Sequence, residues 1–152
     1  IQSLLYKQYK GNYVMLMQYN AQIIRGWPFD GSLDRAEPIK AGVTLVNGDW
    51  VQKQADNTVD KVGATKSFNA GLVVRGNGDS GSSANTNKAT VVWGNFIAQV
   101  QTGLTLTPGQ ALTVQNGALV AGTIGTDPII GYVLDVISAS AVNTASMIVR
   151  IF

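Results

Sequence analysis

Residues Gly78 to Gly81 spell Gly-Asp-Ser-Gly, a string that surrounds the nucleophilic serine of many serine proteases. That chemistry needs an imidazole to take the proton of the serine and a carboxylate to orient the imidazole. The chain of 152 residues contains no His. The string also lies within a segment of Ser, Gly and Asn, a composition that produces it easily. We therefore interpret these residues as part of a loop.

Four oxygen-bearing side chains at alternating positions have the chemistry of ligands for a hard cation such as calcium. They are Asp30, Ser32, Asp34 and Glu37. A calcium-binding loop also needs a glycine at its sixth position and a bidentate acid at its twelfth, and this spacing provides neither. A solvated charge cluster on a loop, made by Asp34, Arg35 and Glu37, is the simpler interpretation. The sequence therefore predicts no metal site.

The sequence lacks some catalytic residue types and shows no recognisable arrangement of the others. Without Cys or His, the chain has no thiolate nucleophile, no disulfide, no imidazole base and no zinc site built on these residues. Nothing singles out two of the nine acidic residues as a pair for glycoside hydrolysis. The glycines at 76, 78 and 81 are not followed by the helix and the Gly-Lys-Ser/Thr of a phosphate-binding loop. We expect a protein that is not an enzyme and has no cofactor.

The aromatic residues have two interpretations. Exposed tryptophans flanked by Asn, Gln and Asp can stack on sugar rings, which would suit a glycan-binding module. Trp50 and Trp93, however, lie in alternating strand contexts, where we expect them to fill a core. Trp27 and Phe29 flank Pro28 and are typical of an anchor pressed into a neighbouring surface.

The charge content is low. Charged residues make up 13% of the chain, whereas soluble domains average about 25%. Eleven basic and nine acidic residues leave a net charge of +2, too weak a field for a dedicated nucleic-acid binder. From Ala89 to Phe152 the charged residues are only Asp127, Asp135 and Arg150. Such a half-chain is expected to be buried or covered by a partner.

No apolar run reaches the roughly 18 residues that a membrane helix needs. The N-terminus has no basic region followed by an apolar run and a small-residue cleavage site. We therefore expect a protein made in the cytoplasm and without a membrane partner.

The positions of the elements follow from hydrophobic alternation and turn signals. Apolar residues alternate with polar ones, as at Val43 and Leu45 and again at Leu112 and Val114. The turn dipeptides that bound these short strands are Asn47-Gly48, Asn77-Gly78, Pro108-Gly109 and Asn116-Gly117. The predicted fold is all-β, a compact antiparallel β-barrel or sandwich with an extended N-terminal arm.

The chain is expected to divide at residue 38. Residues 1–38 are predicted to be an N-terminal arm and linker, and residues 39–152 to be the β-domain. Within the arm, residues 1–24 suggest an extended or edge strand with one short helical turn, and residues 26–38 suggest a linker loop rich in Pro and Gly. Residues 76–87 predict a long mobile loop between two strands.

A weak internal repeat relates the two halves of the β-domain. At an offset of 61, Gly42–Leu45 aligns with Gly103–Leu106, and at an offset of 60, Gly71–Val74 aligns with Gly131–Leu134. The pattern indicates a small β unit used twice. A chance match of short strings is the alternative, and both interpretations predict short antiparallel strands.

Four segments carry a family resemblance: Ala41–Leu45, Gly48–Val51, Ile130–Leu134 and Met147–Phe152. The first is a Gly-containing strand opening and the second a Gly-Asp-hydrophobic turn. The last two are a hydrophobic Gly strand and a short terminus with one basic residue. With these segments the chain resembles the small decoration, or cement, proteins that coat the heads of tailed bacteriophages. The likeness covers about residues 39–152, and the polar loop at 76–87 departs from it.

The resemblance implies a structural role in the virion. Such proteins bind the outer surface of the expanded shell, often as trimers, so the major capsid protein and further copies of the chain are the expected partners. Residues 1–38 are then expected to lie across an adjacent subunit, with anchors at Tyr6, Tyr9, Trp27 and Phe29. The alternative function is a tail-fibre or glycan-binding receptor-recognition module.

Overall fold

The computed structural model describes residues 21–26, 33–80, 87–102, 106–139 and 145–152. These residues form eleven β-strands and no helix, which confirms the predicted all-β class. Accordingly, the described part of the chain has no helix suited to crossing a membrane.

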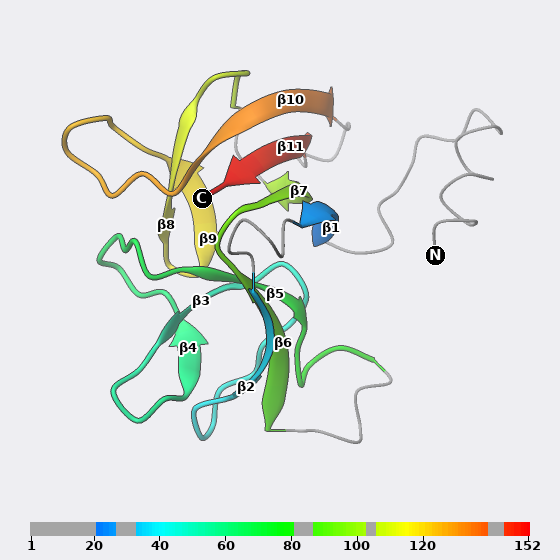
Figure 1. The fold of residues 1–152 in the computed structure, drawn as a ribbon, viewed down its shortest axis with the longest axis vertical. Coiled ribbons are helices and arrows are strands. Elements are labelled where there is room, and N and C mark those ends of the chain that lie inside the picture. The colour runs from blue at the N-terminus through cyan, green and yellow to red at the C-terminus, as the bar shows by residue number, and fades with distance from the viewer. Residues whose placement is uncertain (1–20, 27–32, 81–86, 103–105, 140–144) are drawn as a thin grey trace, which may run out of the picture.

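The strands form two antiparallel sheets, one above the other in Figure 1. The six-stranded sheet contains, in spatial order, β1 (Ala21–Gly26), β7 (Phe96–Thr102), β11 (Ala145–Ile151), β10 (Gly131–Ala139), β8 (Ala111–Gln115) and β9 (Ala118–Ala121). The five-stranded sheet contains β2 (Leu33–Pro38), β6 (Lys88–Trp93), β5 (Gly71–Arg75), β3 (Trp50–Lys53) and β4 (Val59–Lys61). The short link from β6 to β7 carries the chain from one sheet to the other.

Neither sheet closes into a barrel. In the five-stranded sheet, Ile39 just beyond β2 makes a single parallel bridge to Val59 of β4, so the two edges meet at one end without a full ladder. Of the two predicted architectures, the structure has the sandwich-like one, with two packed open sheets.

The N-terminal region is more integrated than the sequence suggested. Strand β1 is an edge strand that pairs with β7, which agrees with the edge-strand interpretation for residues 21–24. Strand β2 pairs with β6 along its whole length, so the linker-loop interpretation is wrong for Leu33–Pro38. The strand pairing overrides the local Pro and Gly signals there.

The two halves repeat one topology. We call residues 33–93 unit 1 and residues 96–152 unit 2. The strand order β2-β6-β5-β3-β4 of unit 1 corresponds, strand for strand, to β7-β11-β10-β8-β9 of unit 2, and β1 is an additional strand on the edge of unit 2. The repeat indicated by the sequence is therefore present in the fold.

The repeat extends to the register of individual residues. A bulge in β5 between Val73 and Arg75 corresponds to one in β10 between Val133 and Asp135. Three cross-strand pairs of unit 1 have equivalents in unit 2. Trp50–Leu72 corresponds to Ala111–Tyr132, Val51–Gly71 corresponds to Leu112–Gly131, and Lys53–Val59 corresponds to Val114–Leu119. Each side chain of unit 1 in these strands thus has a counterpart at the same structural position in unit 2.

The predicted turns explain the matching hairpins. Asn116 and Gly117 have φ angles of 51° and 72°, which fit the tight turn between β8 and β9 because its type requires positive φ at both residues. Gly48 and Gly109, at equivalent positions, have φ angles of 97° and 84°. One expectation fails: residues 42–46 form no strand, although Leu45 is fully buried.

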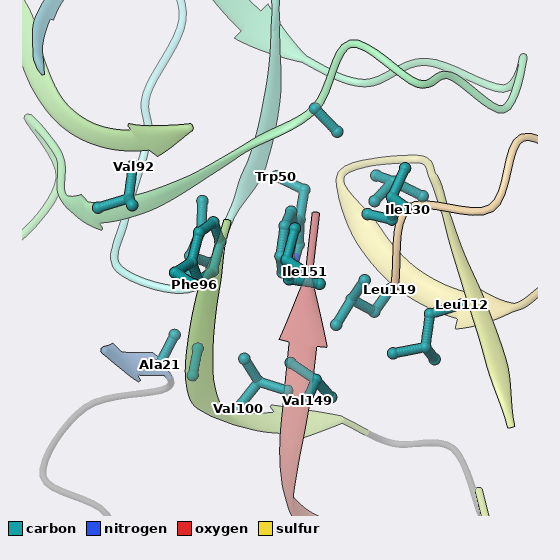
Figure 2. Packing of buried hydrophobic residues seen from close by; sticks show 14 of the residues in the cluster. Ala21, Trp50, Val92, Phe96, Val100, Leu112, Leu119, Ile130, Val149 and Ile151 are labelled. Atoms are coloured by element: carbon teal, nitrogen blue, oxygen red, sulfur yellow. The ribbon is translucent and has the colours of Figure 1, made fainter. Parts of the chain in front are cut away.

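Two buried clusters hold the fold together. The smaller lies inside unit 1 and contains Ile39, Leu45, Val51, Val59, Val73, Ala89 and Val91. The larger fills unit 2 and also takes in Trp50, Leu72 and Val92, which lie side by side on the opposite face of the unit 1 sheet. Figure 2 shows Trp50 among unit 2 residues, where it stacks on Phe96 with ring centroids 6.4 Å apart. The two units therefore share one core.

Replacing Trp50 with Ala should lower the free energy of unfolding by about 3–5 kcal/mol, because it removes the largest side chain that unit 1 buries in unit 2. Urea unfolding followed by circular dichroism measures the change. Phe68→Ala is the control, since Phe68 is 76% exposed and its loss should stay within about 0.5 kcal/mol. Equal losses in the two variants would contradict the shared core.

Candidate functional site

A buried charge cluster lies at one side of the unit 1 core. Glu37 on β2 is only 1% exposed, and its Oε2 accepts a hydrogen bond from Lys53 Nζ on β3. Its Oε1 accepts from Trp93 Nε1 on β6 at 3.2 Å and lies 3.4 Å from Arg35 Nε. Lys53 Nζ also donates to the carbonyl oxygen of Asn57 at 2.9 Å. Three strands thus converge on one carboxylate.

This cluster corrects the prediction of a solvated charge group on a loop. Glu37 is a strand residue whose side chain faces the interior, and both of its oxygens are engaged by donors. Its side chain is therefore enclosed by its neighbours rather than presented to solvent. Asp30 and Ser32 lie outside the described residues, as does the side chain of Asp34. The described residues contain no group of acids arranged to hold a metal ion.

The Gly-Asp-Ser-Gly string begins in a tight turn after β5. The Asp79 carboxylate accepts hydrogen bonds from the backbone N–H groups of Gly76 at 2.7 Å and Asn47 at 2.9 Å. A Cβ on Gly76 would lie 2.0 Å from the carbonyl oxygen of Leu45, so only glycine fits there. Ser80 is exposed. The loop interpretation is confirmed for residues 78–80, and Asp79 has a structural role within it.

Asn47 fixes the start of β1 to unit 1. Its side chain is 6% exposed; Oδ1 accepts from the N–H of Ala21 at 2.8 Å, and Nδ2 donates to the carbonyl oxygens of Ala21 and Val74 at 2.9 and 2.8 Å. Strand β1 itself pairs with β7 of unit 2. Residue 21, where the predicted arm joins the sheets, is thus bound to both units.

Two loops, one from each unit, are joined at the junction between the units. Lys66 in the loop after β4 makes an ion pair with Asp127 in the loop after β9, at 2.9 Å. Asp127 also accepts from the N–H of Thr123 at 2.8 Å. The same two loops carry the most exposed large hydrophobic side chains of the described residues, Phe68 at 76% and Ile124 at 71%.

Unit 2 carries a further group of exposed apolar side chains. Leu134 and Val136 on β10 are 40% and 38% exposed, and Phe152 is 51% exposed. The ring of Phe152 contacts that of Tyr132, also on β10, with centroids 5.5 Å apart. The apolar groups therefore extend along β10 to the C-terminal residue.

The predicted aromatic sites have different outcomes. Trp50 is 2% exposed, which confirms its predicted place in a core. Trp93 is half-buried against the unit 1 core, with its indole N–H directed to Glu37. The predicted anchors Tyr6, Tyr9, Trp27 and Phe29 lie outside the described residues.

Sequence reasoning missed three features: the burial of Glu37, the Asn47 contacts, and the apolar groups at Phe68 and Ile124. The charged and Pro-containing segment around Glu37 resembled a loop. Phe68 and Ile124 are single hydrophobic residues in polar loops, so neither contributes to a periodic pattern. No local signal distinguishes them from residues that fold inward.

Replacing Glu37 with Gln should lower the free energy of unfolding by about 2–3 kcal/mol, because it leaves the Lys53 ammonium facing a neutral amide in a largely buried site. Denaturant unfolding at neutral pH measures this. Asp60→Asn is the matched control in the same unit, since Asp60 pairs with the half-exposed Lys40 and should contribute less than about 1 kcal/mol. A smaller loss for Glu37→Gln than for the control would contradict the assignment.

The junction ion pair predicts a pH dependence. The Thr123 amide and then the Lys66 ammonium hold the pKa of Asp127 below its ordinary value. A carboxyl group with a lowered folded-state pKa contributes stability above its unfolded pKa and loses it as the pH falls through the folded value. The stability difference between the native chain and Asp127→Asn should therefore be largest near neutral pH and disappear in acid. Urea midpoints measured across this pH range test it, and a constant difference would contradict it.

No protein-family model matches this chain, and no curated protein matches it. The candidate sites are therefore defined by the geometry given above.

Proposed function

We propose that the chain is a structural protein of a tailed-bacteriophage particle, a decoration protein that binds the outer surface of the head and stabilises the shell. The resemblance of Gly48–Val51 and Ile130–Leu134 to decoration proteins supports the proposal. The geometry adds that Gly48 and Asp49 form the turn that precedes β3, and that Gly131 begins β10.

The surface of unit 2 is the observation that carries this proposal. Four of the five exposed large hydrophobic residues that the structure describes belong to unit 2. The same unit has only three charged residues, and one of them, Asp127, is engaged by Lys66. A partner that covers a surface with few charges pays little desolvation free energy, and burial of the apolar side chains on that surface is favourable. This combination suits a protein that works by assembly.

The rigid connection between the units gives the mechanism. The shared core around Trp50 and the Lys66–Asp127 ion pair join unit 1 to unit 2. A shell subunit bound to β10 of unit 2 would therefore be held in fixed relation to anything bound by unit 1 or by the arm. A decoration protein of this kind would stabilise the expanded shell against the pressure of packaged DNA by linking neighbouring capsid subunits.

The arm is proposed to bind an adjacent subunit. Residues 1–20 precede β1, and the first residue of β1 is fixed by Asn47. Tyr6 and Tyr9 are the proposed anchors within that segment, with Trp27 and Phe29 between β1 and β2. A firm attachment at Ala21 would transmit force from the arm to both sheets.

The apolar surface is tested by co-sedimentation of the purified chain with phage heads that lack it. The native chain should bind and saturate, and the triple variant Leu134→Gln, Val136→Gln, Phe152→Gln should lose binding while keeping its circular dichroism spectrum. Phe68→Gln is the matched control, an exposed hydrophobic residue of unit 1 that should leave binding unchanged. Binding by the triple variant equal to that of the native chain would contradict the role of unit 2.

Removal of residues 1–20 tests the arm separately, because it leaves β1 intact. Reduced occupancy of the heads is expected, and unchanged occupancy would contradict the arm contact. Electron microscopy of particles carrying the labelled chain tests the location: many copies over the head support decoration. A few copies on the tail would replace the proposal with the receptor-recognition alternative.

A further inference from the structure

Four equivalent positions of the repeat differ in chemistry between the units. In unit 1 they hold a charge cluster, and in unit 2 the equivalent positions are apolar. The register of the ladders matches Arg35 with Ala98, Glu37 with Val100, Lys53 with Val114 and Trp93 with Ile151. All four unit 2 residues are at most 3% exposed.

Two units with one topology risk exchanging strands. Strands β2 and β7 occupy the same place in their sheets and pair in the same register with β6 and β11. The backbone register of β2 on β6 and of β7 on β11 is the same, so this ladder by itself does not distinguish the two strands, although β7 also pairs with β1. Misassembly between similar repeats, within a chain or between copies, is a characteristic failure of such proteins.

The charge cluster distinguishes the correct pairing from the exchanged one. If β2 took the place of β7, Glu37 would lie against Val114 and Ile151, far from Lys53. Only Arg35 would accompany it, and Arg35 is 54% exposed in its side chain. In the other half of the exchange, Val100 would face the Lys53 ammonium. A buried charge without its partner is strongly destabilising.

We propose that the Arg35–Glu37–Lys53–Trp93 cluster directs strand pairing, so that β2 enters unit 1 and β7 enters unit 2. The cluster is costly as a source of stability, because desolvating Glu37 offsets much of what its ion pairs contribute. Because the equivalent positions of unit 2 are apolar, the native pairing of β2 and β7 has a lower free energy than the exchanged pairing. The inference rests on the fold and is independent of the proposed function.

The test is a fourfold variant in which the cluster residues of unit 1 are replaced by their unit 2 equivalents. The substitutions are Arg35→Ala, Glu37→Val, Lys53→Val and Trp93→Ile. The native chain and the variant are unfolded in denaturant and refolded at low and high concentration. At high concentration the variant should lose the native oligomeric state, with a matching gain of larger species that the native chain does not form. Copies labelled with different isotopes should form mixed dimers, detected by native mass spectrometry, if strands exchange between chains.

The matched control is Lys40→Gln with Asp60→Asn, which neutralises an exposed ion pair of the same unit. It should refold to the same oligomeric state as the native chain. Recovery of the fourfold variant in the native oligomeric state, at every concentration and with native hydrogen-exchange protection, would overturn the proposal.

A second variant, Glu37→Met with Lys53→Met, keeps Trp93 and the approximate length of both side chains, and should show the same loss of the native oligomeric state. If neither variant regains the native circular dichroism spectrum at low concentration, the cluster is required for the fold itself and the proposal is also overturned.

Discussion

The structure depends on the packing of one face of unit 1 into the core of unit 2. Trp50, Leu72 and Val92 form a row across β3, β5 and β6, and this row joins the unit 2 cluster. Unit 1 therefore buries both faces of its sheet, one over its own smaller cluster and one over unit 2. Apolar burial is the dominant favourable term in folding, so this contact is the main one that holds the two units together.

Polar groups complete the junction where apolar packing ends. Asn47 ties β1 to unit 1, and Lys66 ties one loop of unit 1 to Asp127 in unit 2. Asn47 satisfies the backbone groups of Ala21 and Val74, and Lys66 adds an ion pair to the hydrogen bond that Asp127 accepts from Thr123. As a consequence, the two loops and the start of β1 are each joined to the opposite unit by side-chain contacts.

The repeat was only partly readable from the sequence, because insertions shift the alignment from strand to strand. Glu37 corresponds to Val100 and Lys53 to Val114, so the separation between equivalent residues differs between the first strand and the next. A single offset therefore matches only short strings. The equivalence becomes clear in the strand order and in the two bulges, since backbone pairing preserves the register that the loops obscure.

The sequence by itself determined the all-β class and several turns, because alternation and Asn-Gly dipeptides act over a few neighbouring residues. It also determined that Trp50 would be buried. Only the tertiary structure decided that β2 is a strand, that Glu37 is buried, and that unit 1 packs on unit 2. The physical reason is that the environment of Glu37 is made by Lys53 and Trp93, on strands brought to it by folding. The sequence of β2 alone does not predict those neighbours.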